Sequence, residues 1–205
     1  MLNIWFVLWV FVATFIFATS VWSYFILFKQ RRSWEIVSEK CHLKYSSTAI
    51  LKSPALTGVF NGIDIDIFAD KPISGKFRDG GSRTIFQLTL KGIVPTQGMI
   101  GSMAFKNFID GVSLTEKYVA EDGKTTLAPD IYNKVRSKDL ISSYLTKERI
   151  VALNAVMTIK NSPAILIFSQ DETLLRIESA DPFDDPVRLE KFLTKATEAA
   201  KLISP

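Results

Sequence analysis

The chain has 205 residues, a formal net charge of +4 and a single cysteine. A charged fraction of 22% with an ordinary aromatic content argues against a disordered chain, and the mild positive charge does not call for a nucleic-acid partner. Cys41 has no second cysteine to pair with, which excludes an intramolecular disulfide and agrees with a reducing compartment.

Residues 4–28 form an uninterrupted apolar run that contains no charged residue. At about 1.5 Å per residue, a helix of this length crosses a hydrocarbon core of roughly 30 Å. We therefore predict one transmembrane helix, whose few hydroxyl groups bond back to carbonyls one turn earlier. Trp5 and Trp9 near one end and Trp22 near the other are candidate contacts with lipid or a partner helix.

The flanks of this run predict its orientation. Lys29, Arg31 and Arg32 follow it directly, whereas no side-chain cation precedes it. Because cationic flanks stay on the cytoplasmic side, we predict the N-terminus outside and the following domain in the cytoplasm. A cleaved signal peptide is the competing interpretation, but it requires a basic start and a cleavage site. We accordingly divide the chain into a transmembrane helix with its basic flank, residues 1–32, and a globular domain, residues 33–205.

The start of the domain contains two residue types that often carry chemistry. Ser33 is a candidate N-cap for a short helix over residues 34–43, which would connect the membrane to the domain. Cys41 and His42 are adjacent, but there is no other cysteine or histidine, so a zinc site is excluded on ligand count. We expect a buried thiol and a capping or surface imidazole.

Residues 56–68, LTGVFNGIDIDIF, predict a β-hairpin. Asn61 and Gly62 accept the positive φ values of a tight turn, and the flanking residues are β-branched or aromatic. Asp64 and Asp66 alternate with isoleucines and therefore lie on one face of the second strand. Two such carboxylates can bind a cation or act as a catalytic pair, but a solvated sheet face is the expected role.

Residues 74–82, SGKFRDGGS, predict a loop, and residues 83–90 predict the strand that follows it. A glycine-rich phosphate cradle requires a helix at this point rather than a strand, so the segment 75–81 is expected to be a hairpin tip. Lys76, Arg78 and Arg83 make it a candidate contact for lipid or for an acidic partner.

The second half of the domain alternates between helical and strand patterns. We predict a strand or short helix over 99–105, buried residues at 108–109, a strand over 114–120, and a short helix that begins at Pro129. Ser137, Thr146 and Asp185 are predicted N-caps of three later helices, the last with Pro186 in its first turn. Between the second and third of these helices, strands over 164–168 and 173–178 predict another hairpin.

The order of these elements resembles a loose group of bacterial single-pass, membrane-anchored proteins of unknown function. The resemblance includes a glycine, an aromatic residue and a second glycine at the first hairpin, here Gly58, Phe60 and Gly62, and the leucine-rich helix over 145–156. The charged segment 124–138 departs from the group and is a candidate docking element. The resemblance implies no catalytic residues.

The predicted fold class is an α+β domain of antiparallel hairpins packed against helices, after one N-terminal transmembrane helix. Its β-rich half spans about 45–120, and its helix–hairpin–helix half about 121–205. We predict a non-enzymatic accessory or assembly subunit of a membrane complex in the bacterial inner membrane, without catalytic, metal or cofactor-binding residues. Its expected partners are membrane lipids and other transmembrane subunits, not nucleic acid. The alternatives are a membrane-tethered module that binds lipid or another ligand in an apolar pocket and, third, an enzyme.

Overall fold

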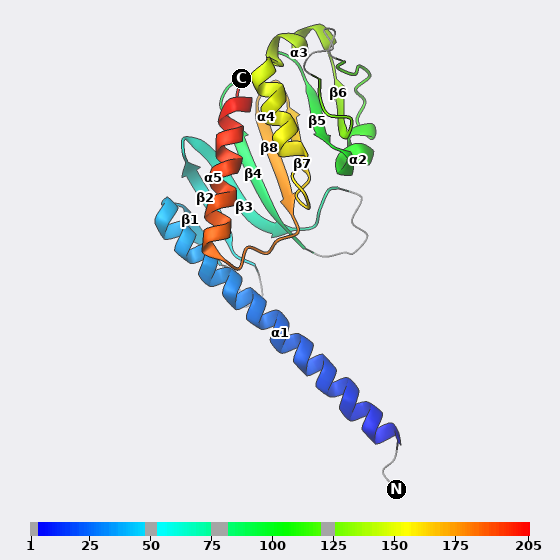
Figure 1. Cartoon of the computed structure of the whole chain (residues 1–205), viewed down its shortest axis with the longest axis vertical. Helices are drawn as coiled ribbons and strands as arrows, with labels where there is room; N and C mark the ends of the chain where they lie inside the picture. The colour runs from blue at the N-terminus through cyan, green and yellow to red at the C-terminus, as the bar shows by residue number, and fades with distance from the viewer. Residues whose placement is uncertain (1–3, 48–52, 75–81, 120–125) are drawn as a thin grey trace.

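A long N-terminal helix leads into a domain built on one antiparallel sheet (Figure 1). The computed structural model describes residues 4–47, 53–74, 82–119 and 126–205. Helix α1 (Ile4–Cys41) has 38 residues, and its first part projects away from the domain while its last turns lie against it (Figure 1). The predicted fold class, an antiparallel α+β domain after an N-terminal apolar helix, is therefore confirmed.

The sheet contains eight strands within the described residues, in the order β1-β2-β3-β4-β8-β7-β5-β6. Every neighbouring pair is antiparallel. β4 pairs with β8, so one sheet runs through both the β-rich half and the later half of the domain. The strands are β1 (Lys44–Ser46), β2 (Ala55–Phe60), β3 (Ile63–Asp70), β4 (Arg83–Leu90), β5 (Gly98–Ser102), β6 (Ile131–Val135), β7 (Ala164–Phe168) and β8 (Thr173–Ser179).

Helices cover both faces of this sheet, but unequally. The end of α1, α4 (Lys147–Met157) and α5 (Pro186–Ile203) pack over one face and close the main hydrophobic core. The 3-10 helix η1 (Met103–Phe105) and α2 (Lys106–Asp110) cover part of the other face, where Phe105 and Ile109 pack on Ile165 in a small second core. Helix α3 (Lys138–Tyr144) connects β6 to α4.

The predicted turn at Asn61 and Gly62 and the predicted N-caps of the three later helices are confirmed. Asn61 and Gly62 have φ values of 54° and 82° between β2 and β3, as the tight turn requires. The side chains of Ser137, Thr146 and Asp185 each accept a hydrogen bond from a backbone N–H in the first turn of α3, α4 and α5. The predicted strand over 83–90 and the hairpin of β7 and β8 are also present.

Three predictions need correction. Ser33 is not an N-cap, because α1 continues through it and Ser33 is buried. Residues 29–32 are Lys, Gln and Arg, which are good helix formers, so the helix does not end there. Residues 131–135 form strand β6 rather than a helix. Of the strand predicted over 114–120, residues 114–119 form only an isolated bridge at Glu116, and residue 120 lies outside the described residues.

The β6 error has a simple cause. Ile131 and Val135, both buried, are four residues apart. That spacing places two side chains on the same face of a helix and also on the same face of a strand, so the pattern alone does not decide between them. For the region 99–105, where both alternatives were open, the structure contains both, because β5 is followed directly by η1.

Candidate membrane anchor and its junction with the domain

The first part of α1 is apolar and bare. Residues 4–25 are all exposed, and α1 is the one helix in the described chain that is long and apolar enough to cross a membrane. The hydroxyl groups of Thr14, Thr19, Ser20 and Ser23 donate to backbone carbonyls three or four residues earlier, at 2.8–2.9 Å. Because these groups are satisfied within the helix, they do not oppose burial in a hydrocarbon environment, as predicted.

Aromatic and basic side chains are exposed along this part of α1 and just after it. Trp5, Trp9 and Trp22 are 66–69% exposed along this part of α1. Lys29 places its ammonium group 4.7 Å from the centre of the Phe25 ring, and Arg32 is exposed one turn further on. Contact of these residues with lipid or with a partner helix stays a prediction.

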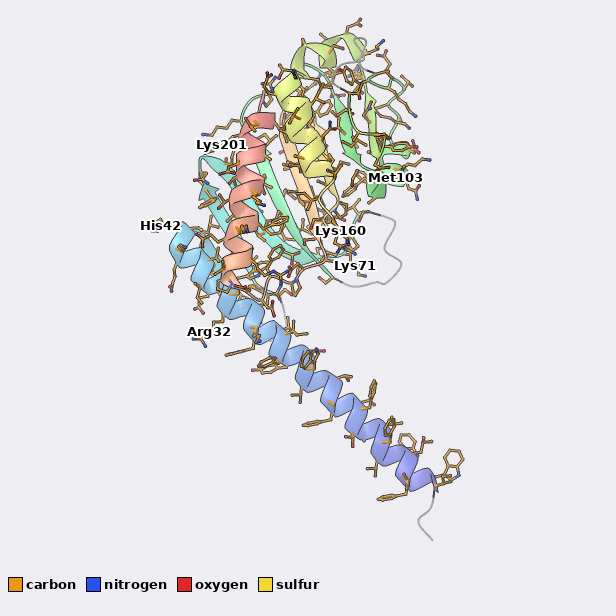
Figure 2. All side chains as sticks on the ribbon, in the orientation of Figure 1. Arg32, His42, Lys71, Met103, Lys160 and Lys201 are labelled. Atoms are coloured by element: carbon orange, nitrogen blue, oxygen red, sulfur yellow. The ribbon has the colours of Figure 1, made fainter. Side chains whose placement is uncertain are left out.

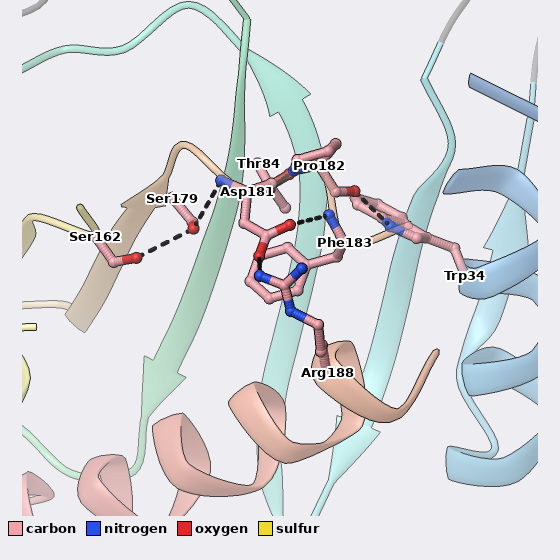
Figure 3. Close-up of polar contacts among 8 residues, drawn as sticks. All are labelled: Trp34, Thr84, Ser162, Ser179, Asp181, Pro182, Phe183 and Arg188. Carbon is pink, nitrogen blue, oxygen red and sulfur yellow. Dashed lines mark hydrogen bonds and ion pairs between the residues drawn. The ribbon is translucent and has the colours of Figure 1, made fainter. Parts of the chain in front are cut away.

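The last part of α1 belongs to the domain. Gln30, Ser33, Val37, Ser38 and Cys41 are buried, and Trp34 is completely inaccessible to solvent. The Trp34 indole Nε1 donates to the carbonyl of Pro182, at 3.4 Å, in the connection between β8 and α5 (Figure 3).

An ion pair on the surface adds a second link between α1 and α5. The Lys40 ammonium lies 2.7 Å from a carboxylate oxygen of Glu190. Both side chains are partly exposed, so this pair adds little to stability, and the buried indole of Trp34 is the main attachment.

The connection that receives Trp34 is itself tightly held (Figure 3). One carboxylate oxygen of Asp181 accepts the Phe183 backbone N–H at 2.8 Å, and the other forms an ion pair with Arg188. The Thr84 hydroxyl donates to the Asp181 carbonyl at 2.7 Å, which fixes the connection to β4. Phe183 has a φ of 53°, an unfavourable value for a bulky residue that the surrounding contacts stabilise.

Sequence reasoning missed this junction. In this connection the sequence predicted the N-cap at Asp185, which is confirmed. The Trp34–Pro182 contact joins residues 148 positions apart, and no local pattern indicates it. The one available signal was the helical spacing of Trp34, Val37 and Cys41, which places them on one face of a helix. From the sequence we predicted that these residues belong to a separate helix after the apolar run.

A buried polar cluster was also missed. Glu178 is fully buried, and its carboxylate accepts hydrogen bonds from the backbone of Ile73 and Ser74, from the Ser74 hydroxyl at 2.6 Å and from Arg176 at 3.0 Å. This carboxylate secures the chain after β3 to the centre of the sheet. Its partners satisfy it fully, so we assign it a structural role.

Comparison with known proteins finds a similar fold in a solved structure. No protein-family model and no curated protein matches the chain. The fold is similar to that of TtfA. The crystal structure of this mycobacterial trehalose monomycolate transport factor A matches with a TM-score of 0.50, over 86% of this chain and 96% of that one. Sequence identity is 10%, so the likeness to TtfA concerns the fold alone.

The predicted candidate residues are scattered over the domain. Asp64 is exposed and Asp66 half-buried on the outward side of β3, as the alternation predicted. Arg83, at the start of β4, lies at a small cleft that it shares with Ile26 and Leu27 of α1. Lys76 and Arg78, with the rest of segment 75–81, lie outside the described residues, as do residues 124 and 125 of the predicted docking segment.

Cys41 and His42 have the predicted burial, with a buried thiol and an exposed imidazole. Cys41 is buried, and burial, with a further contribution from nearby Glu190, raises the pKa of its thiol. His42 is exposed just after the last residue of α1, with a φ of 55°. In the described part of the chain, no hydrogen bond joins its imidazole to a carboxylate or hydroxyl, and no three potential metal ligands cluster.

Proposed function

We propose that this chain is a single-pass membrane protein that acts as a non-enzymatic accessory or assembly factor of a larger membrane transport complex. Helix α1 is its anchor, the N-terminus lies outside, and the domain lies on the cytoplasmic side. The basic residues Lys29, Arg31 and Arg32 at the domain end of the apolar run support this orientation.

The observation that carries the proposal is the continuity of α1. One helix is bare and apolar over residues 4–25 and buried in the domain over its last turns. Apolar surface exposed to water costs about 25 cal/mol per Å², so the bare segment calls for a lipid or protein environment. An unbroken helix also holds the domain at a fixed distance from that environment.

Two features favour an anchor over a cleaved signal. The apolar run of residues 4–28 is longer than the 7–15-residue apolar region of a secretory signal. The helix then continues without a break into the core through Trp34, so the apolar run and the domain form one structural element.

The proposal includes no catalytic activity because the candidate catalytic residues lie on different elements of the fold. His42 lies at the end of α1, whereas Asp64 and Asp66 lie on the outward side of β3. Phe86 and Leu189 pack in the core between the sheet and α5, and this packing favours the proposal over a module with an apolar ligand pocket at that position. Transport enters the proposal from the similar fold of TtfA, a trehalose monomycolate transport factor.

The test is purification of the full chain from native membranes in mild detergent. We expect it to co-purify with a multispanning membrane protein whose level falls when this chain is deleted. A control chain in which residues 4–28 are replaced by an unrelated transmembrane helix retains the anchor and should recover less partner. Migration of the full chain as a lone monomer, with no membrane protein affected by its deletion, would contradict the proposal.

A further inference from the structure

A cleft of about 550 Å³ opens beside the first turns of α5. One wall is α5, and the other is formed by the connections from α4 to β7 and from β8 to α5. The volume lies in the range of small-molecule sites. The cleft therefore has room for a small ligand or for the headgroup of a larger one.

Four basic side chains and a single acidic one line this cleft. Arg188, Lys191 and Lys195 follow one another at helical spacing and thus lie on one side of α5. Lys160 adds a cation on the opposite wall. Figure 2 shows Lys160 in the lower part of the domain, toward the end from which α1 projects.

The acidic residue does not neutralise the lysines. Both carboxylate oxygens of Asp181 are engaged, one by Arg188 and the other by the Phe183 backbone N–H. Within the described residues, no ion pair or hydrogen bond engages the ammonium groups of Lys160, Lys191 or Lys195, and all three side chains are exposed. The cleft is therefore strongly electropositive.

The cleft also has aromatic residues in its lining. Phe183 is buried and Phe192 half-buried, with ring centres 5.1 Å apart, and both pack against Phe86 of β4. Ile159 and Pro182 extend this apolar surface. Basic and apolar side chains that line the same cleft suit a ligand that has an anionic group attached to an apolar body.

The position of the cleft along α1 points to the source of such a ligand. Residues 180–182 line this cleft and also a smaller one that they share with Ile26, Leu27 and Gln30 of α1. Ile26 and Leu27 are among the last residues of the apolar run. If α1 spans a bilayer as proposed above, this end of the domain lies at the level of the headgroups.

We propose that this cleft binds a phosphate group, presented by the headgroup of an anionic phospholipid. Lys160, Lys191 and Lys195 supply the charge, and the accessible apolar lining residues Ile159, Pro182 and Phe192 receive the adjoining apolar part of the lipid. The inference rests on the membrane anchoring proposed above and assigns to the domain a lipid contact of its own, separate from α1.

The test uses the full chain in a neutral detergent and measures lipid binding by native mass spectrometry. The probes are phosphatidylglycerol, zwitterionic phosphatidylcholine and soluble glycerol phosphate. We expect one phosphatidylglycerol per chain, bound at least tenfold more tightly than phosphatidylcholine. The double variant Lys191→Gln/Lys195→Gln should bind phosphatidylglycerol about 25-fold more weakly, at roughly fivefold per lysine.

The matched control is Lys147→Gln/Lys201→Gln, which removes the same charge from exposed lysines at the far ends of α4 and α5. It should change the affinity less than twofold. Equal losses in the two double variants, or no preference for phosphatidylglycerol, would overturn the inference. Binding of glycerol phosphate as tight as that of the lipid would overturn the lipid source and assign the cleft to a soluble phosphate ester.

The same preparations separate this inference from the proposed function. Both double variants retain α1 and should stay in membranes after alkaline carbonate washing and co-purify with the same partner. Unchanged lipid binding in the Lys191 and Lys195 variant with the anchor intact would refute the cleft alone. Because the replaced side chains are exposed, we expect unchanged unfolding midpoints, which circular dichroism would verify.

Discussion

Replacing Trp34 by alanine tests whether α1 is part of the domain or merely attached to it. Trp34 is fully buried, and its indole donates to Pro182. Truncation of a buried tryptophan to alanine costs about 3–5 kcal/mol of unfolding free energy, because contacts are lost and a cavity remains. With a urea slope of roughly 2 kcal/mol per M for a domain of this size, the midpoint should fall by about 1.5–2.5 M.

The assay is urea unfolding of the full chain in a nonionic detergent, followed by circular dichroism of the sheet. Trp22→Ala is the matched control, since it removes the same side chain from the bare part of α1, where Trp22 is 66% exposed. It should shift the midpoint by less than about 0.3 M, the effect of an ordinary surface change. If the two variants have equal midpoints, the end of α1 is not part of the cooperative core and our description of the junction is wrong.

Three further predictions concern the domain itself. Glu178→Ala removes the carboxylate that pairs with the buried Arg176 and should lower the unfolding free energy by about 3–5 kcal/mol. Glu178→Gln retains a hydrogen-bond acceptor and should cost less, so equal losses of the two variants in urea titrations would contradict the structural role of Glu178. Gly98→Ala should lower the unfolding free energy by about 1–3 kcal/mol, because a Cβ at this position would lie 2.6 Å from the Phe168 ring. Gly111→Ala, where the added Cβ would have no neighbour nearer than 3.4 Å, should be tolerated, and similar melting temperatures of the two variants would refute the close packing at Gly98. Burial raises the pKa of Cys41, so the folded chain holds the thiol proton more tightly than the unfolded chain. This contribution to stability is fully present below the unfolded pKa of about 8.5 and is lost as pH rises through the folded pKa. Cys41→Ala should remove the loss of stability that urea titrations detect above about pH 8.5, and an identical pH dependence of the two chains would contradict it.

Features that depend on neighbouring residues were predictable from the sequence. The turn at Asn61 and Gly62 and the caps at Ser137, Thr146 and Asp185 each require only a few adjacent residues, and all four are present. The apolar run and its satisfied hydroxyl groups follow from composition and helix geometry in the same way.

Features that depend on distant residues were not predictable. The pairing of β4 with β8, which unites the sheet, gives no signal in either strand alone. The position of β6 depends on its partner β5, because its own spacing suits a helix equally well. From the sequence we predicted two separate helices where α1 is continuous. The burial of Trp34 that joins them depends on Pro182, which is 148 residues away.

The candidate cleft combines a local feature that the sequence shows with a tertiary feature that it does not show. The spacing of Arg188, Lys191 and Lys195 along α5 is visible in the sequence and is compatible with an ordinary solvated helix face. Only the fold brings Lys160 to the opposite wall and occupies Asp181 elsewhere. The charge of the cleft is therefore a tertiary property that a single sequence does not show.

Our central claim is that α1 is an integral membrane anchor continuous with the domain, and alkaline carbonate washing of membranes that contain the full chain tests it most directly. The washing strips proteins held only by charge, whereas a transmembrane helix of residues 4–28 should keep the intact chain in the membrane pellet. Recovery of the intact chain in the supernatant would contradict the claim.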